Sequence, residues 1–174
     1  MPGLTDILES IRSFIELGGP VLYGIMATLL LMWTFIIERY WYFKAVYPGE
    51  RAKVVAAWDA RIDTTSWYAR RIRERLVSEA SEGLHRHISL IKTLVALCPL
   101  FGLLGTVYGM VLVFDVMAFA GTGNARAMAS GVSQATVPTM AGMVAALSGV
   151  YFATRLEVIA ENESEKLEDL LTHH

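Results

Sequence analysis

Three long segments of this chain carry almost no charge, and they narrow its possible folds sharply. Residues 20–37 and 127–154 contain no charged side chain, and residues 93–120 contain one, Asp115. A helix of about 18 residues rises about 27 Å, which is close to the thickness of the hydrocarbon core of a bilayer. The sequence therefore predicts three membrane-spanning helices at these positions.

The composition favours the same class of protein. Of the 174 residues, 54% are hydrophobic and 18% are charged. A soluble domain of this size has too little interior for so many apolar residues, and a disordered chain is more polar. A single cysteine, Cys98, excludes a disulfide scaffold. We predict an all-α integral membrane protein.

Basic residues predict how the spans are oriented. Eleven of the 15 Lys and Arg residues lie in residues 38–92. Loops rich in Lys and Arg stay on the cytoplasmic side of a membrane. We therefore expect an N-out, C-in orientation, with residues 38–92 in the cytoplasm and a Gly-rich turn, residues 121–126, outside. The basic residues do not form the uniform surface that nucleic acid requires.

The N-terminal residues 1–19 predict a short amphipathic helix on the outer membrane surface. Their apolar residues recur at spacings of three to four, while the acidic start is unlike a cleavable signal.

Spans two and three are predicted to extend into the cytoplasm. From Tyr68, apolar residues recur at helical spacing up to the second span, so we expect an unbroken helix whose weakest point is Gly83. Residues 155–174 predict an acidic helix that continues the third span. Two separate solvated helices are the alternative, but no turn residues divide these segments from the spans.

Residue patterns typical of enzymes are missing from the sequence. It contains no phosphate-binding loop and no local signature of Ser/His/Asp catalysis. His85 and His87 are two residues apart, which points them to different sides of a helix and makes them a poor pair of metal ligands. Cys98 is interpreted as a small buried apolar residue. We expect no enzyme activity, no cofactor and no metal site.

Small residues within spans two and three predict closely packed helices, because they allow two backbones to approach each other. These residues are Gly102, Gly105, Gly109, Gly142 and Gly149.

Polar residues in the same two spans are predicted to share a depth. If the hairpin turns near residue 122, Thr106 and Thr139 lie level with each other near the middle of the membrane. Pro138 leaves the carbonyl of Gln134 without its helical donor, and Pro99 has the same effect one span earlier, so both are predicted helix kinks. Each threonine hydroxyl could instead bond to its own helix. For two threonines beside Gln134 we favour a polar lining.

Asp115 lies toward the outer end of its span, where it can reach the interface or pair with Arg126. The spans therefore hold no deeply placed acidic or basic side chain. If the chain conducts protons, we expect a partner protein to supply the titrating group.

Two stretches resemble the signatures of the MotA/TolQ/ExbB proton-channel family. They are residues 99–110, PLFGLLGTVYGM, and residues 131–146, GVSQATVPTMAGMVAA. Residues 16–39 also resemble ExbB. The order of three spans resembles ExbB and TolQ rather than the four-span MotA, and the short cytoplasmic segment is similar to small ExbB forms of secondary TonB systems.

The resemblance implies a homopentamer in the bacterial inner membrane, so that residues 1–19 and 121–126 would be periplasmic. It implies an ExbD-like single-span partner in the central pore, whose aspartate carries protons, and a TonB-like protein that powers import of siderophores, cobalamin or similar cargo. The pore-lining threonines of the family carry over to Thr106 and Thr139. Its glutamate in span three aligns with Gln134, which cannot titrate.

Other functions remain as alternatives. A TolQ-like role in the Tol envelope-integrity system differs from the ExbB-like role only by degree of resemblance. A passive membrane scaffold would not depend on the proton gradient. A small-molecule transporter is disfavoured because the sequence shows no inverted repeat.

Overall fold

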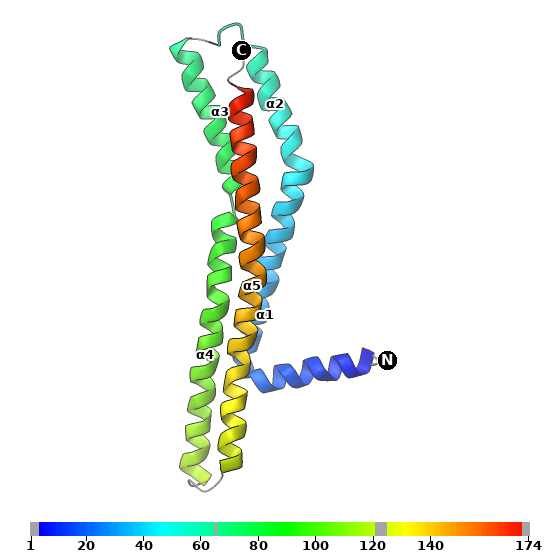
Figure 1. The fold of residues 1–174 in the computed structure, drawn as a ribbon, viewed down its shortest axis with the longest axis vertical. Helices are drawn as coiled ribbons and strands as arrows, with labels where there is room; N and C mark the ends of the chain where they lie inside the picture. The colour runs from blue at the N-terminus through cyan, green and yellow to red at the C-terminus, as the bar shows by residue number, and fades with distance from the viewer. Residues whose placement is uncertain (1–3, 65, 121–124, 172–174) are drawn as a thin grey trace. The chain divides into compact units, whose positions relative to one another are not determined.

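The computed structural model describes residues 4–64, 66–120 and 125–171, and within these ranges the regular structure is helical (Figure 1). The predicted turn at residues 121–126 therefore lies mostly outside the described residues, as do the two ends of the chain. The elements are α1 (Leu4–Trp41), the π-helical segment η1 (Tyr42–Val46), α2 (Tyr47–Asp59), α3 (Trp67–His85), α4 (Ile88–Ala120) and α5 (Ala125–Leu170).

Three helical stretches among the described residues are long and apolar enough to cross a membrane. They lie within Gly18–Asp59, Trp67–Phe119 and Met128–Leu170. The prediction of an all-α membrane protein with three spanning helices is confirmed. The orientation of these helices in the membrane stays a prediction.

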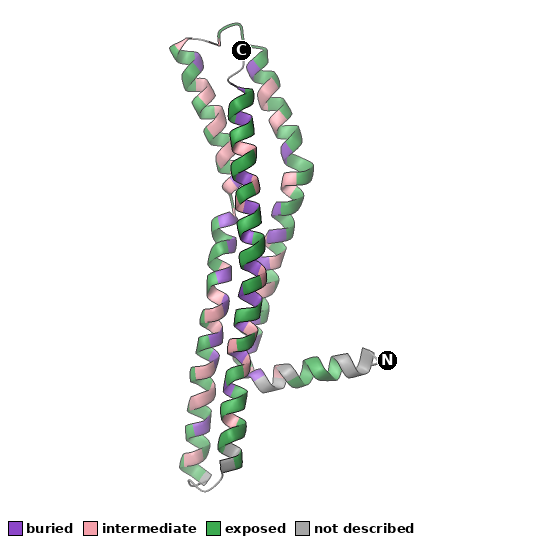
Figure 2. Ribbon diagram, in the orientation of Figure 1, coloured by how far each residue is buried: buried purple, intermediate pink, exposed green. Residues whose placement is uncertain are grey.

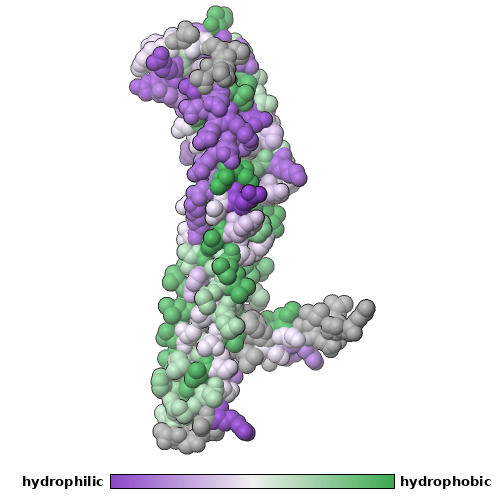
Figure 3. Space-filling model, viewed as in Figure 1, coloured by the Kyte–Doolittle hydropathy of each residue, from purple (hydrophilic) through white to green (hydrophobic). Residues whose placement is uncertain are grey.

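The chain divides into two compact units. We call Met1–Met32 with Thr93–Val150 the apolar unit, and Trp33–Lys92 with Tyr151–His174 the charged unit. On the face drawn in Figure 3, hydrophobic residues cover much of the apolar unit and hydrophilic residues cover much of the charged unit. Helices α1, α4 and α5 each contribute residues to both units.

Within the apolar unit, α1 is interrupted at Gly19. The backbone of Gly19 has φ 65° and ψ −166°, a conformation that only glycine adopts without strain. Pro20 follows, and proline is favoured in the first turn of a helix because its N–H group is not needed there. The interruption falls at the boundary that the sequence places between the amphipathic segment and the first span. Leu8 and Ile11 of the preceding segment are exposed.

A second irregularity, η1, precedes Pro48. The proline ring conflicts with the carbonyl four residues earlier in a regular helix. The backbone N–H of Tyr47 donates instead to the carbonyl of Tyr42, five residues back. The extra residue in this turn changes which side of α2 faces its neighbours.

The charged unit has its own apolar core at the ends of α2, α3 and α5. Its buried residues are Trp58, Ala69, Leu167 and Leu171, with six partly buried side chains packed around them. Figure 2 shows buried residues recurring along each of these helices among exposed ones, as expected for helices with one packed face.

The predicted unbroken helix from Tyr68 into the second span is wrong at one point. Helix α3 ends at His85, Arg86 adopts an extended ψ of 136°, and His87 has a positive φ of 66° before α4 begins. No glycine or proline lies at the break itself, and it is held by contacts from α1 that periodicity does not reveal. The first span also continues past residue 37, through η1 and α2. Residues 38–92 are predicted to be helical, but this continuity with the first span is not part of that prediction.

Candidate functional site

Helices α4 and α5 approach each other so closely that their glycines have no room for a side chain. A Cβ on Gly142 would lie 2.5 Å from the carbonyl oxygen of Cys98, and a Cβ on Gly109 would lie 2.6 Å from the Cβ of Ala135. Both distances are shorter than real contacts, so any larger residue would push the helices apart. These two glycines therefore set the spacing of the hairpin.

The same contacts fix which residues of the two helices face each other. Gly105 lies against the ring of Pro138, and a Cβ on Gly102 would lie 2.9 Å from the Cα of Thr139. This register agrees with the one predicted from the sequence to within about one helical turn. Pro138 thus fills the space beside Gly105, and it lies inside a continuous helix, as Pro99 does in α4.

Gly149 marks a contact among three helices of the apolar unit. A Cβ there would collide with the side chains of Met32 and Val95. Met32 is fully buried. Helix α5 therefore presents one small-residue face to both α1 and α4, as expected where lipid supplies no hydrophobic force to hold helices together.

The hydroxyl of Thr139 bonds across the hairpin. It donates to the carbonyl oxygen of Gly102 on α4 at 2.9 Å. The bond is possible because Gly102 has no side chain to block the approach and because a carbonyl oxygen can accept two hydrogen bonds. Thr139 thus joins the two helices at the centre of their contact.

The hydroxyl of Thr106 bonds within its own helix, donating to the carbonyl of Leu103 at 2.7 Å. Thr106 is half-buried, while the neighbouring Leu103 and Val107 are exposed. The two threonines lie within about one helical turn of each other in depth, yet one closes a helix contact and the other borders an apolar surface.

The remaining predicted site residue, Gln134, is exposed on α5. Asp115 and Arg126 are also exposed. Among the described residues, no group of three or more His, Cys, Asp or Glu side chains is placed to hold a metal ion.

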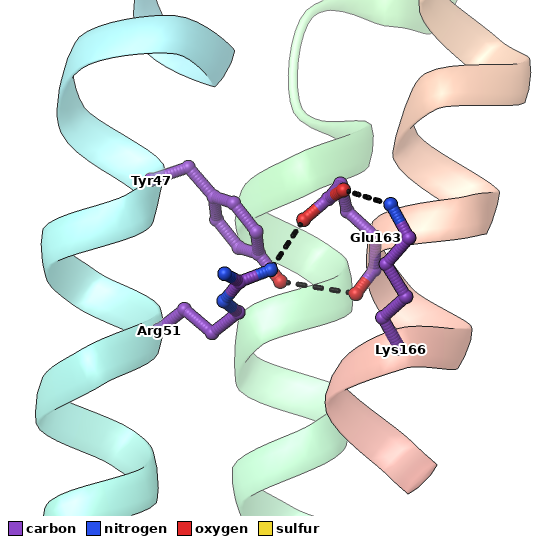
Figure 4. A network of polar contacts seen from close by, with 4 residues as sticks. All are labelled: Tyr47, Arg51, Glu163 and Lys166. Atoms are coloured by element: carbon purple, nitrogen blue, oxygen red, sulfur yellow. Dashed lines mark hydrogen bonds and ion pairs between the residues drawn. The ribbon is translucent and has the colours of Figure 1, made fainter. Parts of the chain in front are cut away.

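Polar contacts also join the helices of the charged unit (Figure 4). Glu163 of α5 accepts from Arg51 at 3.1 Å and from Lys166 at 2.7 Å, and its backbone carbonyl accepts from the hydroxyl of Tyr47 at 3.1 Å. Tyr47 lies ten residues beyond the predicted span, and burial raises the pKa of its hydroxyl. The hydroxyl therefore stays protonated and donates to Glu163 at neutral pH.

Sequence reasoning missed one buried charge. Arg39, the first basic residue after span one, is only 3% exposed and contacts Gly83 and His87. Its position beside an apolar run is typical of an interfacial cation, so nothing in the sequence indicates that it is buried.

These features define a multi-pass helical membrane protein whose last two spans form a glycine-packed hairpin with hydroxyls near its centre. Residues 50–169 match the family described as the MotA/TolQ/ExbB proton channel family. The chain belongs to this family, and the resemblance seen in its two span motifs is confirmed.

Curated relatives carry ExbB names. The chain is 29% identical over 177 residues to "Putative biopolymer transport protein ExbB-like 1" of Synechocystis sp., covering 83% of this chain and 69% of the relative. It is 38% identical over 72 residues to "Putative biopolymer transport protein ExbB-like 3" of the same organism, covering 40% of this chain and 34% of the relative. It is 32% identical over 77 residues to "Biopolymer transport protein ExbB" of Pseudomonas putida, covering 44% and 23%. No solved structure gives a significant match.

Proposed function

We propose that this chain is an ExbB-like stator subunit of a proton-driven motor in the bacterial inner membrane. In this proposal five copies surround an ExbD-like single-span protein, and the complex passes energy from the proton gradient to a TonB-like protein that drives import across the outer membrane. Membership of the proton channel family and the ExbB names of the relatives support it.

The observation that carries the proposal is the position of Thr106. Its hydroxyl lies on a partly exposed surface of α4, where the neighbouring exposed residues Leu103 and Val107 are large and apolar. The bond to Leu103 uses the proton of this hydroxyl, and its oxygen can still accept a hydrogen bond from a partner group or from water. A ring of copies would turn this surface toward a shared pore and make Thr106 part of its lining.

The charge pattern of the spans supports a partner that carries the proton. The predicted spans contain Asp115 as their one acidic residue, and it is exposed near the end of α4. An ionisable group in the middle of a membrane is costly, and threonine hydroxyls offset part of that cost. In the proposed mechanism Thr106 and Thr139 solvate the partner's carboxyl group, and Gln134 contributes hydrogen bonds without titrating.

The test combines assembly with function. The native mass of the detergent-solubilised chain is measured alone and after co-expression with an ExbD-like partner, and we expect a five-copy ring that retains the partner. A stable monomer or dimer that does not bind the partner would remove the central pore and contradict the proposal.

The pore residues are then tested by substitution at matched protein levels. Thr106→Val removes the hydroxyl but keeps the shape of the side chain, and we expect proton flux and gradient-dependent import to fall at least about tenfold. Thr106→Ser, which keeps the hydroxyl, is the control. Normal uptake in a Thr106→Val, Thr139→Val double variant would reject the polar lining, and uptake independent of the gradient would favour a passive scaffold.

A further inference from the structure

The buried guanidinium of Arg39 holds both sides of the break between α3 and α4. Its Nη1 donates to the carbonyl oxygen of Gly83, in the last turn of α3, at 3.0 Å. Its Nη2 lies 3.1 Å from Nδ1 of His87, the residue directly before α4. The ring of Tyr42 packs against the same guanidinium, 4.9 Å from its carbon to the ring centre. All four residues belong to the charged unit.

The contact with His87 specifies the protonation of one ring nitrogen. A guanidinium has donors and no acceptor, so it can bond to Nδ1 only when that nitrogen carries no proton. Arg39 keeps its charge at all physiological pH values. The bond between Arg39 and His87 therefore requires a neutral His87 whose proton is on Nε2.

A second group competes for the same nitrogen. One carboxylate oxygen of Glu38 lies 3.5 Å from Nδ1 of His87 and 3.1 Å from Nε of Arg39. A carboxylate only accepts hydrogen bonds. When His87 gains a proton, Nδ1 can donate to Glu38 but can no longer accept from Arg39, so the two contacts exclude each other.

The backbone at His87 makes this exchange structurally significant. A positive φ of 66° is costly for a residue with a side chain and persists only with support from its surroundings. The bond from Arg39 and the ring of Phe35, 5.5 Å from the imidazole between ring centres, supply that support. The His87 side chain is 33% exposed, so water can deliver the proton.

Of the other titratable groups near the break, Arg86 directly precedes His87 and is exposed, while His85 and Lys92 have partners of their own. Glu38 and Arg39 of α1 are the charged groups in contact with His87. In α3, His85 places its Nδ1 2.9 Å from the carbonyl oxygen of Ser81. A little more than one turn along α4, Lys92 bonds to Glu157 of α5.

We propose that the α3–α4 break is a pH-sensitive latch, in which protonation of His87 releases Arg39, transfers the imidazole to Glu38 and loosens the junction. A histidine changes charge within the physiological pH range, and the group is placed to respond to the compartment that holds the charged unit. The latch does not depend on the proposed stator function, because all of its residues lie in this chain.

Hydrogen exchange of the full chain in lipid nanodiscs tests the latch directly. Peptides covering residues 82–91 are followed by mass spectrometry between about pH 5.5 and about pH 8, the range in which histidine titrates. The comparison variant is His87→Asn. The Oδ1 of asparagine can take the place of Nδ1 as an acceptor that does not titrate in this range, and asparagine tolerates a positive φ.

We expect protection of residues 82–91 in the wild-type chain to fall about tenfold, relative to His87→Asn at the same pH, as the pH is lowered. Comparison at equal pH cancels the intrinsic pH dependence of exchange. His85→Asn should behave as the wild type does, because His85 bonds within its own helix. Equal protection in the wild type and His87→Asn at every pH would overturn the latch.

Glu38→Gln is an independent check if His87→Asn folds poorly. It removes the carboxylate that would receive the protonated ring, so the pH at which protection falls should move down by about half a unit or more. An unchanged midpoint in Glu38→Gln would equally contradict the proposal.

Discussion

At the scale of single residues, the hairpin depends on glycines, which have no side chain, as much as on the larger residues around them. The carbonyl oxygen of Cys98 lies where a side chain at Gly142 would begin, and Ala135 blocks the space beside Gly109. Glycine is usually unfavourable within a helix, because it gains backbone freedom when the chain unfolds. Its use at these positions indicates that close packing of the helices stabilises the protein by more than glycine destabilises each helix.

This argument predicts that Gly142→Ala destabilises the protein by about 1–3 kcal/mol, because the new methyl group overlaps the backbone of α4. The matched control is Gly49→Ala in α2, where a Cβ would meet nothing within 4 Å. That change should be neutral or stabilise by up to about 1 kcal/mol. Unfolding by a denaturing detergent, followed by circular dichroism, measures both, and equal stability of the two variants would contradict the packing argument.

The two threonines should differ in their effect on stability although they lie at similar depths. Thr139→Val removes a bond between helices and should cost about 0.5–1.5 kcal/mol. Thr106→Val removes only a bond to its own helix and should change stability by less than about 0.5 kcal/mol. The same unfolding assay compares them. A larger loss of stability in Thr106→Val than in Thr139→Val would contradict these hydrogen-bond assignments.

The sequence predicts which residues lie in the hairpin contact better than it predicts the partner of each residue. Spacing of small residues anticipated the close faces, and the register of the hairpin was predictable because both helices rise by a constant amount per residue. The partner of a hydroxyl was not predictable, because a threonine can bond either to a carbonyl of its own helix or to one of the facing helix. The burial of Arg39 was also hidden, since it depends on a contact with Gly83, 44 positions away in the chain.

At the scale of elements, the two irregularities of the charged unit differ in how far sequence could reveal them. Pro48 is a local signal for the π-helical turn before it, because a proline ring conflicts with the carbonyl four residues earlier. The break at His87 has no such signal, because histidine gains its positive φ from the contacts with α1. Apolar periodicity predicted the helices on both sides and therefore joined them into one.

The turn at η1 determines which side of α2 meets α5, and Tyr47 reports on that contact. Tyr47→Phe removes the hydrogen bond to the carbonyl of Glu163 and should cost about 1 kcal/mol. Tyr40→Phe, at an exposed position on α1, is the control and should stay within about 0.5 kcal/mol of the wild type. Detergent unfolding distinguishes the two, and a neutral Tyr47→Phe would mean that α2 does not hold this position against α5.

At the scale of the whole molecule, the arrangement of apolar side chains divides the chain by environment. Large apolar residues of the apolar unit remain exposed on α4 and α5, including Leu103, Phe114, Val144 and Leu147. Exposed patches of this kind are rare on soluble proteins, and they indicate contact with lipid or with other membrane proteins. The charged unit instead leaves its acidic and basic side chains exposed or half-buried, with Arg39 as the buried exception among the described residues, and forms bonds such as those around Glu163.

This division, with 13 of the 15 Lys and Arg residues in the charged unit, predicts opposite locations for two exposed positions. Lys53 should face the cytoplasm and Arg126 the periplasm. Cysteine is introduced at each position in turn, and intact cells are treated with a membrane-impermeant maleimide. The native Cys98 is fully buried and should give little background. We expect Arg126→Cys to react in intact cells and Lys53→Cys to react only after the inner membrane is opened, because charged segments do not cross the bilayer spontaneously. The reverse pattern would invert the orientation. It would also place the latch at His87 on the side of the membrane from which protons enter.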